Sequence, residues 1–202
     1  MILNLMEELD IKGHLTISKV YPTGREEVVF DDHNIIVSGM GVALAHLFAL
    51  SGSNSIVDYQ IDRFQIGVSG STAREVISTT TLGDPIESIA TYGVDSNVIA
   101  VSAHQIINNS IVTTPRIYAI IPQQNITRID ANTVRYTLIV DELALNNVTR
   151  SSVPVSINEI GLFVKNIKGQ ATDAPILVAY RYFNPILKTD DFSLVFRWSI
   201  SF

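Results

Sequence analysis

The chain has 202 residues, of which 47% are hydrophobic and 17% charged, so it is long and apolar enough to bury a sizeable core. Its 14 Lys and Arg against 20 Asp and Glu give a formal net charge of −6, and the scattered basic residues disfavour nucleic-acid binding. The absence of cysteine excludes disulfides, thiolate metal sites and a cysteine nucleophile.

The sequence shows no membrane or export signal. Its longest apolar run, residues 40–45, is far shorter than the ~20 residues that cross a bilayer. Residues 1–10 lack the basic start of a signal peptide and turn acidic. We therefore expect a protein made in the cytoplasm, with no membrane partner.

Residues 1–11 are expected to form an N-terminal arm. Apolar residues recur there at helical spacing, at Ile2, Leu5, Met6 and Leu9. So short a helix is not stable alone in water, so the arm must dock on its own domain or on a neighbour.

Residues 13–21 and 26–30 predict a β-hairpin. They flank Pro22-Thr23-Gly24, which has the composition of a turn. We expect Asp32-His33-Asn34 to end the second strand.

Only residues 38–50 (SGMGVALAHLFAL) predict a convincing helix. Ser38 is a candidate N-cap, and residues 51–53 (SGS) end the pattern. So much apolar surface on one helix implies burial against a sheet.

Residues 59–68 predict a further strand. The next segment, residues 69–110, is rich in Ser and Thr and shows little periodicity. A structureless stretch of this length is unusual inside a compact domain. We interpret 69–110 as an extended insertion ordered by contacts, including contacts with another subunit. The alternative is a surface loop.

The rest of the chain predicts a series of strands, of which the last is the clearest. From residue 192 to 202, large apolar residues alternate with smaller or polar ones, and the predicted core face consists of Phe192, Leu194, Phe196, Trp198, Ile200 and Phe202. The predicted fold is all-β, a mostly antiparallel β-sandwich with one buried helix near 38–50. Residues 12–202 would form its single domain.

No pattern of catalytic or ligand-binding residues is found. The histidines at 14, 33, 46 and 104 are far apart and form no metal-binding pattern. Residues 31–33 (DDH) are more typical of a solvated strand end, and residues 67–71 (GVSGS) lack the helix and lysine of a phosphate site. We expect no catalytic, cofactor or metal site, and no enzyme.

Two charged residues share strand parity with apolar neighbours. Glu159 shares its strand parity with Ile157 and Phe163, and Arg181 shares its parity with Ala179 and Phe183. A charge on an apolar face needs a partner. We therefore predict a structural ion pair between Glu159 and Arg181, and the alternative is two unrelated surface residues.

Residues 158–163 (NEIGLF), 177–181 (LVAYR), 182–189 (YFNPILKT) and 196–202 (FRWSISF) resemble segments of many phage structural proteins, tail-fibre and baseplate parts among them. Nearer the N-terminus, residues 30–47 (FDDHNIIVSGMGVALAHL) and 64–70 (FQIGVSG) resemble further segments of the same proteins. The relatives belong mainly to tailed bacteriophages with contractile, T-even-like tails.

This resemblance implies a non-enzymatic virion subunit that mediates assembly in the tail, at the baseplate, the neck or a fibre attachment. Its partners would be other virion proteins and copies of itself, in a trimer or a ring. The low share of charged residues also favours subunit contacts. The alternative is a carbohydrate-binding receptor module of a tail fibre, for which Tyr59, Tyr92 and Tyr118 are candidate contacts.

Overall fold

The computed structural model describes residues 11–49, 59–87, 98–107, 110–165 and 175–202. The predicted N-terminal arm lies outside this part of the chain, apart from Ile11. No helix in the described residues is long and apolar enough to cross a membrane.

Ten strands form one antiparallel sheet in the order β4-β5-β3-β10-β11-β2-β1-β12-β7-β6. The strands are β1 (Lys12–Val20), β2 (Glu26–Ile36), β3 (Ile61–Gly67), β4 (Val98–Ile107), β5 (Ser110–Ile120), β6 (Ile126–Arg128), β7 (Thr133–Val140), β10 (Ile157–Val164), β11 (Ile176–Ile186) and β12 (Ser193–Ser201). A separate small hairpin contains β8 (Thr149–Arg150) and β9 (Val153–Pro154). The all-β prediction is confirmed.

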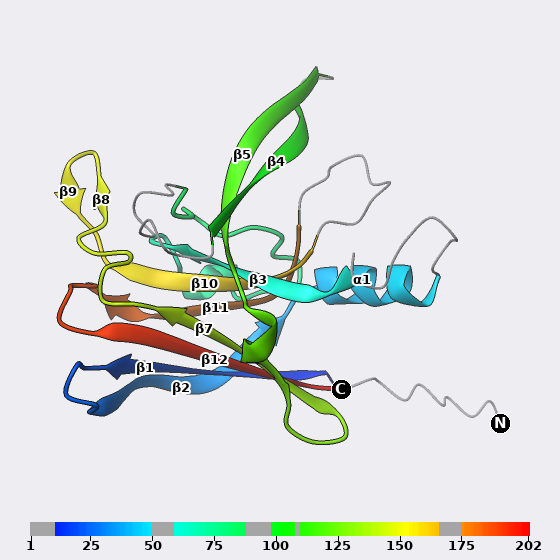
Figure 1. Cartoon of the computed structure of the whole chain (residues 1–202). Coiled ribbons are helices and arrows are strands. Elements are labelled where there is room, and N and C mark those ends of the chain that lie inside the picture. The colour runs from blue at the N-terminus through cyan, green and yellow to red at the C-terminus, as the bar shows by residue number, and fades with distance from the viewer. Residues whose placement is uncertain (1–10, 50–58, 88–97, 108–109, 166–174) are drawn as a thin grey trace.

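The sheet curls so that its two halves face each other across the core (Figure 1). Strand β2 joins the halves, because it pairs with β1 along most of its length and with β11 only through Ile35 and Ile36. Side chains of the two halves meet inside: the rings of Phe64 and Trp198 lie 5.9 Å apart, and those of Phe183 and Phe196 lie 6.3 Å apart. The two layers are therefore halves of one continuous sheet.

The predicted period of two in the last strand is confirmed. Leu194, Phe196, Trp198 and Ile200 are fully buried, and Phe192 is nearly so. Phe202 is the exception, with 42% of its surface exposed. It follows the end of β12, beyond the residues that pair with β1 and β7, so the prediction that it belongs to the core face is wrong.

The β1–β2 hairpin forms as predicted, with Gly24 at φ 82°, a left-handed conformation that glycine adopts without strain. The expected strand end at Asp32-His33-Asn34 is wrong, because β2 continues to Ile36. These three residues pair with Leu15, His14 and Gly13 of β1, and this pairing outweighs their low strand propensity.

Helix α1 (Gly39–Phe48) lies against β11. Ser38 occupies the N-cap position, but its side chain makes no capping hydrogen bond. Only Met40 and Ala43 are fully buried, whereas Phe48 is 85% exposed. The prediction of a buried helix is therefore correct for one face and wrong for the other.

Where the structure describes it, the predicted insertion at 69–110 contains two different parts. Residues 68–86, here called the 68–86 loop, return to β3, where Pro85 bridges to Gly67 and the Ile86 amide donates to the Ile66 carbonyl at 2.8 Å. Strand β4 instead pairs along its whole length with β5, and the hairpin projects from the body (Figure 1). The structure thus corrects the boundary at residue 110, since that residue begins β5.

The buried stripe of β12 yields a stability prediction. Phe196→Ala removes a fully buried ring, and we expect the free energy of unfolding to fall by about 3–5 kcal/mol. Ile139→Ala, at a side chain 56% exposed on the neighbouring strand β7, should change it by less than about 1 kcal/mol. Urea unfolding followed by the fluorescence of Trp198, the single tryptophan, measures both. Equal losses in the two variants would contradict the packing described.

Candidate functional site

Glu159 is the most buried acidic group among the described residues, with no exposed surface. It lies in β10, which is paired on both sides, with β3 and with β11. A second apolar cluster lies apart from the main core and contains Val37, Leu82, Tyr118, Phe163, Leu177 and Tyr180. Leu82 belongs to the 68–86 loop, so this loop covers part of the β10–β11 surface.

Four donors surround the Glu159 carboxylate. Oε1 accepts hydrogen bonds from the amides of Asp84 at 2.9 Å and Ser69 at 3.3 Å. Oε2 accepts from the Gly83 amide at 2.9 Å and from the Tyr180 hydroxyl at 3.0 Å. Charge-assisted hydrogen bonds of this kind offset the cost of burying a carboxylate. Glu159 therefore holds both ends of the 68–86 loop.

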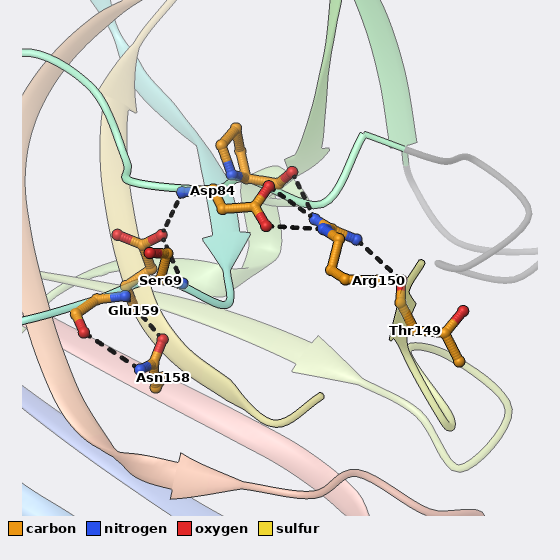
Figure 2. A network of polar contacts seen from close by, with 8 residues as sticks. Ser69, Asp84, Thr149, Arg150, Asn158 and Glu159 are labelled. Carbon is orange, nitrogen blue, oxygen red and sulfur yellow. Dashed lines mark hydrogen bonds and ion pairs between the residues drawn. The ribbon is translucent and has the colours of Figure 1, made fainter. Parts of the chain in front are cut away.

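Asn158, the preceding residue, holds the same loop. Its Oδ1 accepts from the Gly70 amide at 2.8 Å, and its Nδ2 donates to the Gly70 carbonyl at 3.2 Å (Figure 2). The Asn158 side chain thus makes both hydrogen bonds to the Gly70 backbone that a neighbouring strand would make to a paired residue. Asn158 and Glu159 thus bind successive residues of the loop from successive positions on β10.

Asp84 extends the network to the β8–β9 hairpin (Figure 2). Arg150 Nε lies 2.7 Å from Asp84 Oδ2, and its Nη2 lies 3.1 Å from Oδ1. The guanidinium also donates to the Pro85 carbonyl at 3.1 Å. One loop residue, Asp84, therefore donates its amide to Glu159 and accepts from Arg150 with its carboxylate.

Close packing around the carboxylate requires glycine. A Cβ atom at Gly70 would lie 2.6 Å from the Asn158 carbonyl oxygen, and one at Gly83 would lie 2.5 Å from the Ser69 carbonyl oxygen. A Cβ at Gly67 would collide with the Glu159 carboxylate itself. The loop backbone can approach β10 this closely only without side chains at these positions.

The predicted ion pair between Glu159 and Arg181 does not form. In the register of β10 and β11, Arg181 lies opposite Ile160 and Glu159 lies opposite Tyr182. Directly opposite residues point to the same face and successive residues to opposite faces, so the two charges point to opposite faces of the sheet. Glu159 did need a partner, but its partners are amides and a hydroxyl.

Arg181 nevertheless contacts the same loop. Its Nη1 lies 3.0 Å from Glu75 Oε1, and its Nη2 lies 2.6 Å from Asp32 Oδ2 on β2. Glu75 also accepts a hydrogen bond from the Tyr182 amide at 3.2 Å. Arg181 and Glu75 thus link the middle of the 68–86 loop to the place where the two halves of the sheet diverge.

Lys188 holds a different loop, which follows β7. It is 2% exposed, and its Nζ donates to the Glu142 carbonyl at 3.2 Å, to Asn146 Oδ1 at 2.9 Å and to the Thr189 carbonyl at 2.7 Å. Burial lowers the pKa of Lys188 to about 8, against the opposing effect of nearby carboxylates such as Asp141. Sequence reasoning did not single out this residue, although it lies in one of the stretches that resemble phage proteins.

The Glu159 network can bind and position backbone, and its carboxylate is shielded from solvent. Both oxygens are occupied by donors, and burial, followed by the neighbouring negative charge of Glu159, raises the pKa of Tyr180 above its usual value. Tyr180 is therefore a protonated donor at neutral pH. In the described part of the chain, no three His, Asp or Glu side chains are arranged to hold a metal ion.

Other residues considered from sequence lie apart from this network. His14 and His33 face each other on paired positions of β1 and β2, with ring centroids 5.5 Å apart. His46, on α1, stacks on Tyr59 at 5.9 Å. Comparison of the chain with protein families, curated proteins and solved structures finds no match.

The first prediction from this site concerns the charge of Glu159. Glu159→Gln replaces one accepting oxygen with an NH2 group that faces buried donors, so we expect the free energy of unfolding to fall by about 2–4 kcal/mol. Glu27→Gln is the matched control, because Glu27 is exposed and accepts a single hydrogen bond from Tyr21. Urea unfolding measures both variants, and an unchanged stability in Glu159→Gln would contradict the assigned role.

The second prediction compares two glycines. Gly70→Ala forces a Cβ against β10, and we expect a loss of about 2 kcal/mol together with faster proteolysis within the 68–86 loop. Gly41→Ala, on α1 where a Cβ meets nothing within 4 Å, should instead stabilise the fold by about 0.5–1 kcal/mol. Effects of the same sign in both variants would contradict the close approach at Gly70.

The third prediction concerns pH. The folded-state pKa of Lys188, about 8, is below its ordinary 10.5, so above pH 8 the unfolded chain retains a proton that the folded chain has lost. Stability should therefore rise with pH, by up to about 2 kcal/mol between pH 8 and pH 9.5. Urea titrations across this range should show the rise in the native chain and a flatter profile in Lys188→Met. Parallel profiles would disprove the assignment to Lys188.

Proposed function

We propose that the chain is a non-enzymatic structural subunit of a tailed-bacteriophage virion, which mediates subunit contacts in the tail at the baseplate, the neck or a fibre attachment. It is made in the host bacterial cytoplasm and incorporated into the particle. The observation that carries the proposal is the Glu159 carboxylate, whose two oxygens are both used to fix a surface loop. A loop held in this way presents a constant shape to a neighbour.

The stretches that resemble phage structural proteins contain the residues that fix the loops. Asn158 and Glu159 belong to NEIGLF, Arg181 to LVAYR and Lys188 to YFNPILKT. Each holds a loop through contacts made by its side chain. The residues that fix the loops thus lie within the resembling stretches, and this location supports the proposal.

The fixed loops carry exposed apolar side chains. Ile77, in the 68–86 loop, is 69% exposed, and its carbonyl accepts a hydrogen bond from the Ser38 amide at 2.8 Å. Leu143, in the loop held by Lys188, is 78% exposed. Exposed apolar groups on a fixed backbone are available for burial against a neighbouring subunit. They support a role in assembly.

The carbohydrate-binding alternative loses two of its three candidate contacts. Tyr59 is 7% exposed and Tyr118 is 3% exposed, so neither ring can stack on a sugar. Tyr118 packs instead against Phe163, with ring centroids 5.1 Å apart. Tyr92 lies outside the described residues. Assembly is therefore the function that the described residues support better.

The test is the composition of purified particles of the phage that encodes the chain. We expect peptides of this chain in density-gradient-purified virions, at a constant ratio to the major tail proteins, and antibody labelling confined to the tail. Absence of the chain from purified particles, while it is abundant in infected cells, would overturn the proposal.

The surface assigned to assembly can be tested separately on the full chain. Ile77→Asp and Leu143→Asp should each abolish incorporation into particles, with the unfolding curve unchanged because both side chains are exposed. Val28→Asp, at an apolar side chain 58% exposed in the β1–β2 hairpin, is the matched control and should incorporate normally. Normal incorporation of all three variants would show that the two loops do not belong to the interface.

A further inference from the structure

An apolar pocket of about 340 Å³ lies where α1 meets both halves of the sheet. Its walls come from α1, from the entry to β3, from β7, from the last residue of β10 and from the residue after β12, and they consist of Met40, Ala43, Leu44, Leu47, Tyr59, Gln60, Ile61, Tyr136, Val164 and Phe202. Sites for small molecules have volumes of roughly 300–1,000 Å³ and a mostly apolar lining with few polar groups. The volume and the lining of this pocket therefore fit a small molecule.

Three of the wall residues are apolar side chains that the fold buries only in part. Leu44 and Leu47 pack against the main core but remain half-buried. Phe202 is 42% exposed, although its backbone is fixed by Asn132, whose carbonyl accepts from the Phe202 amide at 3.0 Å and whose Nδ2 donates to the Phe202 carbonyl at 3.1 Å. A ligand in the pocket would bury apolar surface that these side chains still expose.

Tyr136 supplies the polar group of the pocket on which recognition would depend. It lies opposite Trp198 in the register of β7 and β12, so both side chains point to the core face of the sheet. Tyr136 is 6% exposed, and within the described part of the chain its hydroxyl makes no hydrogen bond. Burial raises the pKa of Tyr136 to about 12, so the hydroxyl is a protonated donor at neutral pH. A buried donor without an acceptor costs free energy, and an oxygen of a ligand would supply that acceptor.

The Tyr136 oxygen is also within reach of the pocket. Among the described residues, the side-chain polar atoms that are both sealed from solvent and without a partner are Asn34 Nδ2 and Arg181 Nε. The Tyr136 hydroxyl is not one of them, so it retains some accessible surface, and Tyr136 lines the pocket. The hydroxyl is therefore open to a ligand from the pocket side.

The lining also decides the charge of the ligand. No charged side chain is found among the described residues that form the walls, and a charged group placed there would lose its hydration without gaining a partner. Of the other polar wall residues, Gln60 donates through Nε2 to Gln123 Oε1 at 3.1 Å, and Tyr59 stacks on His46. The walls thus favour a neutral ligand that meets its hydrogen-bond donor at Tyr136.

We propose that this pocket binds a small, neutral and mostly apolar molecule, one oxygen of which accepts a hydrogen bond from the Tyr136 hydroxyl. The walls belong to α1 and to both halves of the sheet, so the ligand would hold the helix against the sheet and stabilise the folded chain. This binding site does not depend on the proposed place in a virion, because every wall residue belongs to a single chain.

Prodan, a neutral naphthalene that carries one ketone, is a suitable probe, because its emission shifts to the blue in an apolar site. We expect the native full chain to bind prodan at one site. Tyr136→Phe removes only the hydroxyl and should weaken prodan binding about 5- to 10-fold in a fluorescence titration. Tyr21→Phe is the matched control, because it removes a hydroxyl that donates to Glu27 outside the pocket, and it should bind prodan as the native chain does.

Two further compounds separate the hydrogen bond and the charge from apolar contact. Naphthalene has the same ring system without the ketone, and it should displace prodan equally well from the native chain and from Tyr136→Phe. Anilinonaphthalene sulfonate carries a negative charge, and it should bind the native chain at least 10-fold more weakly than prodan. The urea midpoint of Tyr136→Phe should be no lower than that of the native chain, which also establishes that the variant is folded.

Four results would overturn the proposal. Failure of the native chain to bind prodan would show that the pocket does not admit a ligand. Equal prodan affinity in the native chain and Tyr136→Phe, or equal weakening of prodan and naphthalene in this variant, would show that the hydroxyl is not the donor. Binding of the sulfonate as tight as that of prodan would contradict the preference for a neutral ligand. A lower urea midpoint in Tyr136→Phe would show that the chain itself already supplies the acceptor.

Discussion

A carboxylate without contact with water must find all of its hydrogen-bond donors within the protein, and this requirement governs the arrangement around Glu159. Its four donors come from Ser69, Gly83, Asp84 and Tyr180, and three of them are backbone amides of a single loop. If the loop left β10, the buried carboxylate would therefore lose three of its four hydrogen-bond donors. Its covering position on the sheet follows from that cost.

The same principle recurs at two other places in the fold. Arg181 links Glu75 in the middle of the 68–86 loop to Asp32 on β2, next to the point where β2 pairs with β11 at only two positions. Lys188 donates to the Glu142 carbonyl and the Asn146 side-chain oxygen in the loop after β7. Arg181 lies in β11 and Lys188 lies two residues beyond its end, and each supplies a charged group that holds irregular backbone. The strands thus build the core and also set the shape of the surface.

The strands and the helix could be predicted because their signals are local. The period of two between Leu194 and Ile200, and the turn at Gly24, are each contained in a few residues. The partners of Glu159 could not be predicted, because three of its four donors are loop amides that lie 75 to 90 positions away in the sequence. Backbone amides also have no sequence signature. What the sequence did indicate is that a charge on an apolar strand needs a partner, and the nearby glycines at 67, 70 and 83 are the feature that would have suggested a closely packed backbone.

The most direct test of this account is amide hydrogen exchange at single-residue resolution in the native chain. The amides of Ser69, Gly83 and Asp84 lie in a loop, yet their hydrogen bonds to Glu159 predict slow exchange, comparable to that of the amides within β10. Exchange of these three amides at the rate of unbonded loop amides, while β10 remains protected, would contradict the claim that the buried carboxylate holds the loop.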